Sequence, residues 1–89
     1  MPQRIAIIDF ETTGMSPLHG ARAAEVGIVL VEGGRIVDRY QSLMNAGQRM
    51  PWSITQLTGI TSAMLQTAPP AEAVMREAAD FVAGVPMVA

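Results

Sequence analysis

The fold is decided by the stretch RIAIIDFETTG at residues 4–14. Residues 4–10 are almost continuously apolar, which predicts a β-strand that is covered on both faces. Side chains alternate along a strand, so Asp9 and Glu11 are expected to project from one face at the strand's end. Turn-forming residues then predict a loop over residues 12–20. Because ligands bind at the carboxyl ends of parallel strands in open α/β sheets, the two acids are candidate site residues.

The spacing of Asp9 and Glu11 suits metal binding. Two carboxylates about 6–7 Å apart at their Cα atoms can converge on one hard cation. Oxygen ligands of this kind suit Mg²⁺ or Mn²⁺. The alternative is that Asp9 only caps the turn that follows the strand, because acids are common in turns. The spacing by itself leaves both interpretations open.

Two further β-rich runs follow the loop, at residues 25–32 and 35–44. The pair Gly33-Gly34 between them predicts a tight hairpin, because a primed turn needs positive φ at both central positions. These two strands are therefore expected to be antiparallel neighbours.

The second half of the chain predicts helices. Ser53 is expected to be the N-cap of a capping box with Gln56, in a short helix that ends at Gly59. Thr61 is expected to cap a second short helix, over residues 62–66. A longer helix is predicted over 71–83, between Pro69-Pro70 and Gly84. Its apolar stripe is expected to pack on the core and consists of Val74, Ala78, Phe81 and Val82.

The last five residues, 85–89, are expected to begin another buried strand. A strand, a helix and a strand in this order predict a crossover to a strand parallel to the first. Chain termini normally lie exposed, so a terminus in a buried strand is unusual. Residues 1–89 are therefore expected to be the incomplete N-terminal part of a single α/β domain.

Composition narrows the function classes. The chain has 89 residues, 49% of them hydrophobic, and a net charge of −2. It has no cysteine, which excludes disulfides, thiolate zinc sites and a cysteine nucleophile. No apolar run approaches the ~18 residues of a membrane span, and no signal peptide is readable, so a soluble cytoplasmic protein is expected. Without a basic surface, any nucleic-acid role must be local or must use metal ions.

The string Asp9-Phe10-Glu11-Thr12-Thr13-Gly14 resembles the first motif of the DEDDh exonucleases, the family of the proofreading subunit of bacterial DNA polymerase III. The resemblance continues in order along the chain. Leu57-Thr58-Gly59-Ile60-Thr61 is similar to the segment beside the terminal nucleotide. Ala68-Pro69-Pro70, the following helix and Pro86-Met87-Val88-Ala89 are similar to the approach to the second motif.

The resemblance implies a ribonuclease H-like fold, here truncated to three antiparallel strands, a helical crossover and the start of a fourth strand parallel to the first. It implies 3′→5′ hydrolysis of single-stranded ends with two Mg²⁺ or Mn²⁺ ions, held in part by Asp9 and Glu11 as catalytic residues. Thr12 would contact the terminal nucleotide through its backbone N–H, and Leu57 and Thr58 would line its pocket. The product would be a nucleoside monophosphate. DNA proofreading or repair is favoured, with a polymerase subunit as a candidate partner, and RNA trimming is the alternative.

The chain departs from the family by lacking its later catalytic groups, two further aspartates and a histidine. His19, the sole histidine, is not at the family's general-base position. Glu25, near the site, is interpreted as structural, with a supporting role beside the site residues as the less favoured alternative. The chain therefore carries half an active site, and we expect little or no nuclease activity from it alone.

Two other functions remain open. An aspartyl phosphatase with Asp9 as nucleophile is disfavoured, because the second acid is Glu11 and the chain has no lysine to hold a phosphate. A non-catalytic fragment that self-associates as a homo-oligomer is the other alternative, because an unfinished sheet exposes an edge and apolar surface. For Trp52 and Tyr40 we expect a packing role, with base stacking as the less favoured alternative.

Overall fold

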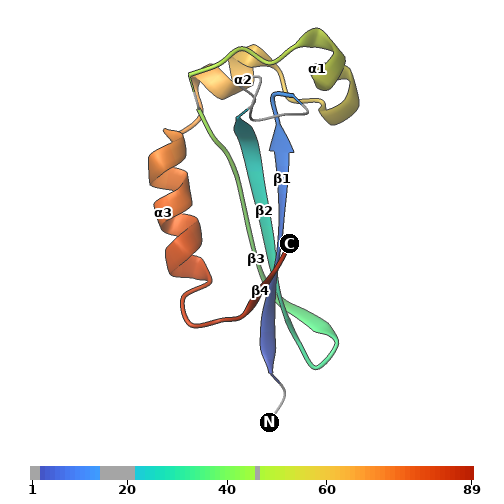
Figure 1. Ribbon diagram of the computed structural model, residues 1–89, viewed down its shortest axis with the longest axis vertical. Coiled ribbons are helices and arrows are strands. Elements are labelled where there is room, and N and C mark those ends of the chain that lie inside the picture. Colours follow the sequence, from blue (N-terminus) through green and yellow to red (C-terminus); the bar gives the residue numbers. More distant parts are fainter. Residues whose placement is uncertain (1–2, 15–21, 46) are drawn as a thin grey trace.

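Four strands form one mixed sheet in the computed structural model, which describes residues 3–14, 22–45 and 47–89. The strands are β1 (Arg4–Thr12), β2 (Ala23–Glu32), β3 (Arg35–Leu43) and β4 (Met87–Val88). Their order is β3-β2-β1-β4, with β4 parallel to β1 and the other neighbours antiparallel (Figure 1). The predicted strands, their directions and the crossover are confirmed. The predicted burial of β1 on both faces and of β4 is wrong: Ile7 is 44% exposed on the face of β1 away from α3, and Met87 and Val88 are 60% and 53% exposed, because nothing in the described residues covers them.

The β2–β3 hairpin turns at Gly33-Gly34. Both glycines have positive φ, 59° and 79°, as a primed turn requires. Glu32 and Arg35 face each other immediately before and after the turn. The two-residue loop therefore fixes the register of β3 against β2.

Three helices lie between β3 and β4 in the described part of the chain: α1 (Trp52–Thr58), α2 (Ser62–Gln66) and α3 (Ala71–Phe81). Gly59 ends α1 with φ 79°, and the Thr61 hydroxyl accepts a hydrogen bond from the Met64 amide at 3.1 Å, so both predicted caps are confirmed. The predicted capping box is wrong, because Ser53 lies inside α1 and Pro51 is its N-cap. The Pro51 carbonyl accepts from the amides of Ile54 and Thr55, which starts the helix earlier.

The core lies between α3 and one face of the sheet. Alternate residues of β1 and β2 point toward α3, and Ala6, Val26 and Ile28 are at most 2% exposed. Val74 and Ala78 of α3 pack against them, with Phe81 half-buried beside them, and Val82 packs just beyond the helix end. The predicted stripe is confirmed, although α3 ends at Phe81 rather than at residue 83.

A second, smaller cluster holds α1 and α2 against the end of the sheet. Its buried members are Ala24, Met50, Ile60 and Leu65, with Leu43 and Ile54 packed at its edge. Figure 1 shows α1 and α2 together beyond the carboxyl end of β1, while α3 lies along the sheet. The two clusters therefore fix two separate helical layers on the same sheet.

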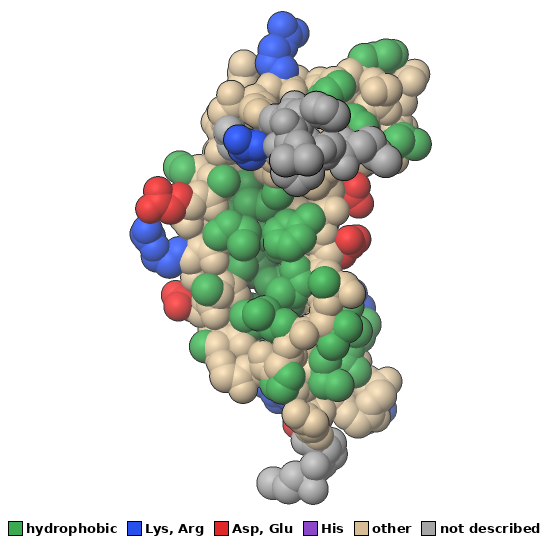
Figure 2. All heavy atoms as spheres, viewed as in Figure 1, with side chains coloured by type: hydrophobic (Ala, Val, Ile, Leu, Met, Phe, Trp, Pro, Cys, Tyr) green, Lys and Arg blue, Asp and Glu red, His purple; other side chains and the backbone are tan. Residues whose placement is uncertain are grey.

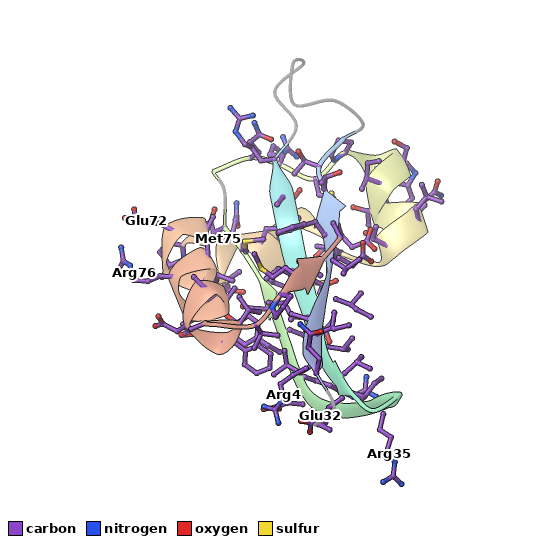
Figure 3. All side chains as sticks on the ribbon, turned by 60° about the horizontal axis from the view of Figure 1, so that its bottom comes forward. Arg4, Glu32, Arg35, Glu72, Met75 and Arg76 are labelled. Atoms are coloured by element: carbon purple, nitrogen blue, oxygen red, sulfur yellow. The ribbon has the colours of Figure 1, made fainter. Side chains whose placement is uncertain are left out.

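Exposed ion pairs lie away from α1. The Arg4 guanidinium is 3.5 Å from the Glu32 carboxylate, near the hairpin end of the sheet, and Arg76 is 3.0 Å from Glu72 on α3 (Figure 3). Arg35 extends outward from the hairpin in the same view. Exposed pairs of this kind contribute at most about 1 kcal/mol. Packing of apolar side chains therefore stabilises the fold more than these ion pairs do.

None of the helices in the part of the chain that the structure describes combines the length and apolar character needed to cross a membrane.

Tyr40 joins β3 to α3. Its ring lies 5.6 Å from the ring of Phe81, centroid to centroid, and its hydroxyl donates to the Glu77 carboxylate at 3.1 Å. The predicted packing role of Tyr40 is confirmed. Burial raises the pKa of the Tyr40 phenol, and the hydrogen bond to Glu77 and its negative charge raise it further.

Ionisation of Tyr40 should lower the stability of the fold at alkaline pH. The chain has one tyrosine, no lysine and no cysteine, so no other side chain ionises near pH ~10. Because the folded pKa is raised, the unfolded chain loses the phenolic proton first. Stability should be constant just below pH ~10 and fall as pH rises through the folded pKa. Ultraviolet titration of tyrosinate with urea unfolding measures both quantities. Tyr40→Phe should remove this dependence of the free energy of unfolding on pH. If the dependence is unchanged in that variant, the ionisation of Tyr40 is not its cause.

Candidate functional site

A shallow cleft lies on the sheet face opposite α3. Its volume is about 330 Å³. It is lined by Ile7, Asp9 and Glu11 of β1, by Glu25, Gly27, Ile28 and Val29 of β2, and by Arg39, Tyr40 and Gln41 of β3. Strand alternation explains most of the set, because odd-numbered residues of β1 point away from the core that Ala6 and Ile8 join, whereas Ile28 and Tyr40 pack on the α3 side. The structure therefore places Asp9 and Glu11 on one face, as predicted.

Gly27 leaves open space in the cleft, because it has no side chain. Gly27 lies opposite Asp9 in the β1–β2 register, and a Cβ built on it would meet nothing within 4 Å. Asp9 is exposed and Glu11 is half-buried. No described arginine forms an ion pair with either carboxylate, although Arg39 lines the same cleft. Both acids are therefore available to a ligand.

Glu25 adds a third carboxylate to the cleft, although its position in the sequence favoured a structural role. It lies directly opposite Glu11 in the antiparallel register and lines the cleft. The Gln41 side-chain amide donates to the Glu25 carboxylate at 2.9 Å. Strand alternation along residues 25–32 could have placed Glu25 on a sheet face, but only the cross-strand register shows that this face is the one that carries Glu11.

The regular pairing of β1 with β2 is interrupted immediately after Glu11. A register shift separates Glu11 from Thr12, and the Thr12 hydroxyl donates to the Gly14 carbonyl at 2.6 Å. Thr13 is 6% exposed, and its hydroxyl donates to the Gln48 side-chain carbonyl and accepts from the Arg22 amide, each at 2.9 Å. These bonds tie the end of β1 to the start of β2 and to the segment after β3.

Thr13 should be a measurable contributor to stability. Thr13→Val removes the acceptor of the Arg22 amide and the donor to Gln48, which we expect to cost about 1–3 kcal/mol. The melting temperature would fall by roughly 4–8 °C for each kcal/mol. Thr13→Ser keeps the hydroxyl and should lose less than half as much. Thermal unfolding by circular dichroism measures both variants, and equal losses would show that the methyl group rather than the hydroxyl matters.

Leu57 and Thr58 do not line the cleft. Both belong to α1, which lies beside the carboxyl end of β1 in two views (Figures 1 and 3). The Leu57 side chain is 82% exposed, whereas the Thr58 hydroxyl donates to the Ile54 carbonyl at 3.0 Å and accepts from the Ile60 amide at 3.1 Å. Leu57 is thus open to a ligand, and Thr58 is held as part of the α1 terminus.

Carboxylate oxygens fit a hard divalent cation, and Asp9 and Glu11 offer them on one face. Among residues 3–14, 22–45 and 47–89, no group of three or more acidic or histidine side chains is arranged to hold an ion. His19 lies outside the described residues. The donor chemistry of Asp9 and Glu11 therefore fits Mg²⁺ or Mn²⁺, although the described part of the chain supplies no third ligand arranged with them.

Comparison with known proteins identifies the family. The sequence profile of an exonuclease family matches residues 6–89, so the chain belongs to this exonuclease family. It is 38% identical over 87 residues to the 3′-5′ exonuclease DinG of Bacillus subtilis, covering 98% of this chain and 9% of that protein. It is also 38% identical over 76 residues to the DNA polymerase III subunit epsilon of Aquifex aeolicus, covering 85% of this chain and 37% of that one.

Solved structures that resemble this chain are also exonucleases. The nuclease domain of 3′hExo, a DEDDh family member bound to rAMP, superimposes with a TM-score of 0.80 at 26% identity, over 91% of this chain and 44% of that one. Exonuclease X in complex with 5′ overhanging duplex DNA gives a TM-score of 0.73 at 27% identity, over 83% and 42%. The sheet and its helices are thus those of the ribonuclease H-like exonucleases. The chain spans less than half the length of each of these relatives.

Proposed function

We propose that residues 1–89 are the N-terminal part of one exonuclease domain that removes nucleotides from the 3′ end of single-stranded nucleic acid. The observation that carries the proposal is the placement of Asp9 and Glu11 on one sheet face, in a cleft that Gly27 leaves open opposite Asp9, in a chain of this family. Relatives that are DNA polymerase III proteins favour DNA as the substrate, proofreading or repair as the role, and a polymerase as the partner. RNA trimming is the alternative within the same chemistry.

Asp9 and Glu11 are the proposed ligands of Mg²⁺ or Mn²⁺. When bound, such ions lower the pKa of water near the phosphodiester and neutralise charge on the departing oxygen. The two carboxylates lie at the edge of the cleft nearest the end of β1, so they would orient the scissile phosphate there. The Thr12 backbone N–H and the Leu57 and Thr58 side chains would hold the terminal nucleotide. The product is a nucleoside monophosphate.

The proposal also predicts that the chain is inactive by itself, because Asp9 and Glu11 provide only part of a two-ion ligand set. With Mn²⁺ and a 5′-labelled single-stranded oligonucleotide, the isolated chain should leave the strand intact. Joined after Ala89 to the remainder of the exonuclease domain of the Aquifex aeolicus relative, it should shorten the strand stepwise from the 3′ end. A 3′-terminal phosphorothioate should block shortening. Metal-dependent shortening by the isolated chain would refute the half-site, and shortening from the 5′ end would refute the polarity.

Self-association is a second candidate, because apolar side chains remain exposed on β1 and β4. Phe10 is 42%, Met87 60% and Val88 53% exposed. Figure 2 shows hydrophobic side chains gathered on the surface between α3 and β1. An apolar surface of this kind favours association between copies. Light scattering distinguishes the candidates: a monomer across a concentration series excludes self-association, whereas a dimer that dissociates in Met87→Ser supports it.

A further inference from the structure

We propose that the outer face of α1, led by Trp52, is a stacking platform for bases of single-stranded nucleic acid that lie 5′ of the terminal nucleotide. This inference rests on the proposed function, because it extends the substrate path beyond Leu57. The predicted packing role of Trp52 is wrong, since the side chain is 73% exposed. An indole left in water forgoes the stabilisation that its burial would give, roughly 3–5 kcal/mol for a core tryptophan.

The helix is oriented so that Trp52 and Leu57 are exposed, while its other large apolar residue, Ile54, is turned toward the core. Ile54, Thr55 and Thr58 are half-buried, whereas Trp52, Ser53, Gln56 and Leu57 are exposed. Ile54 packs at the edge of the second core cluster, and the Thr55 hydroxyl donates to the Ile60 carbonyl at 2.8 Å. These contacts fix which face of α1 meets the molecule. Trp52 and Leu57 are therefore both exposed, but at 3.6 residues per turn they lie about 140° apart around the axis, at the two edges of the solvent face with Ser53 and Gln56 between them.

The backbone that carries Trp52 is held rigidly. Met50 is 6% exposed, and its amide donates to the Ser62 hydroxyl at 2.8 Å. Pro51 follows with a fixed φ of −59°, and its carbonyl accepts hydrogen bonds from two amides of α1. Trp52 is the next residue. A platform that is ordered before binding loses little conformational entropy when a base stacks on it, which strengthens binding.

The charge of this region suits a polyanion. Residues 39–71 contain no aspartate or glutamate, although the chain has eight acidic residues in total. Within this segment Arg49 is exposed and lies three residues before Trp52, and it forms no ion pair with a described residue. Figure 2 shows hydrophobic side chains at the surface over α1. Proteins that bind single strands without sequence preference combine aromatic side chains with positive charge, and the sequence supplies both within residues 49–52.

The spacing fits a path that continues from the terminal nucleotide. Trp52 and Leu57 are separated by about 7.5 Å along the axis of α1, at 1.5 Å per residue. Stacked nucleotides rise about 3.4 Å along a strand, so the axial separation alone corresponds to roughly two nucleotides, and the angle of about 140° between the two side chains adds to it. If Leu57 contacts the terminal nucleotide, Trp52 would meet a base at least two nucleotides further from the 3′ end.

Trp52 reports on its own contact, because it is the sole tryptophan of the chain. Titration with a short oligothymidylate in Ca²⁺ should quench its fluorescence. A strand made abasic at every position except the 3′-terminal one should bind with little quenching. Trp52→Ala should weaken binding of the intact strand about fivefold to a hundredfold, as expected for the loss of one stacked base, measured by fluorescence anisotropy of a labelled strand. Trp52→Phe should restore most of the affinity, and Trp52→Leu should not.

Ile36→Ala is the matched control, because Ile36 is 49% exposed near the hairpin. It should bind the strand like the original chain. Three results would overturn the platform: no quenching at saturating strand, equal affinity of Trp52→Ala, or quenching that follows chain concentration alone, which would show a second copy on α1. If Asp9→Asn leaves strand shortening by the joined domain intact, the proposed function fails whatever Trp52 does. If Asp9→Asn abolishes shortening while Trp52 is not quenched, only the platform fails.

Discussion

Asp9→Asn should abolish strand shortening by the chain joined to the rest of an exonuclease domain. The substitution keeps the size of the side chain and removes the charge that a divalent cation requires. Residues that only orient metal ligands typically contribute ~10–100-fold to metal affinity or activity, so loss of a direct ligand should lower the rate by more than ~100-fold. Quantifying the shortened products of a 5′-labelled strand in Mg²⁺ measures the effect.

The isolated chain allows an independent measurement of the same substitution. Mn²⁺ should selectively broaden the NMR signals of Asp9 and Glu11 and of Gly27, which faces Asp9 across the β1–β2 register. Asp9→Asn should abolish this broadening. Asp80→Asn is the matched control, because Asp80 is an exposed aspartate on α3, on the opposite side of the sheet from the cleft. Broadening that persists in Asp9→Asn, or that disappears equally in Asp80→Asn, would show that the ion does not occupy the cleft.

Ile28→Ala should cause a large loss of stability. Ile28 is 2% exposed at the centre of the cluster between the sheet and α3. Truncation of a buried isoleucine removes apolar burial and leaves a cavity, at a cost of about 2–5 kcal/mol. An 89-residue chain has a total stability of roughly 4–13 kcal/mol, so the substitution removes a large part of it. The melting temperature should fall on the order of 10–30 °C.

Ile36→Ala provides the comparison for this prediction. It removes the same atoms from a side chain that is 49% exposed in β3, so the change in stability should stay within about 0.5 kcal/mol. Urea unfolding gives the free energy of both variants. If the two substitutions cost the same, the sheet and α3 do not pack as described, and the position of the cleft on the opposite face loses its support.

Predictions from residue pattern succeeded where local physics decides the structure. Gly33-Gly34 adopts the positive φ values that a tight hairpin requires, and the stripe of Val74 and Ala78 faces the sheet because helical periodicity allows one buried side. The caps at Gly59 and Thr61 were predictable for the same reason, since each depends on groups within five residues.

Two predictions for α1 failed, one because a residue close by competes for the N-cap position and one because packing against distant residues sets which helix face is exposed. Ser53 has the residue type of an N-cap, but the carbonyl of the preceding Pro51 starts α1 and leaves Ser53 within it. Trp52 was expected to pack, because large aromatic side chains usually do. Its exposure follows from the way Ile54 and Thr55 turn the opposite face of α1 toward the second core cluster.

By itself, the residue pattern determined the β2–β3 hairpin, the crossover to a strand parallel to β1, and the projection of Asp9 and Glu11 from one face of β1, whereas the antiparallel pairing of β1 with β2 was implied by the family resemblance. These features depend on alternation and on turn geometry, which neighbouring residues set. Only the tertiary structure decided that Glu25 stands opposite Glu11, that Gly27 opens the cleft beside Asp9, and that Trp52 lies in solvent. Those facts depend on the register between strands and on which helix face the core covers, and both are set by contacts between residues far apart in the chain.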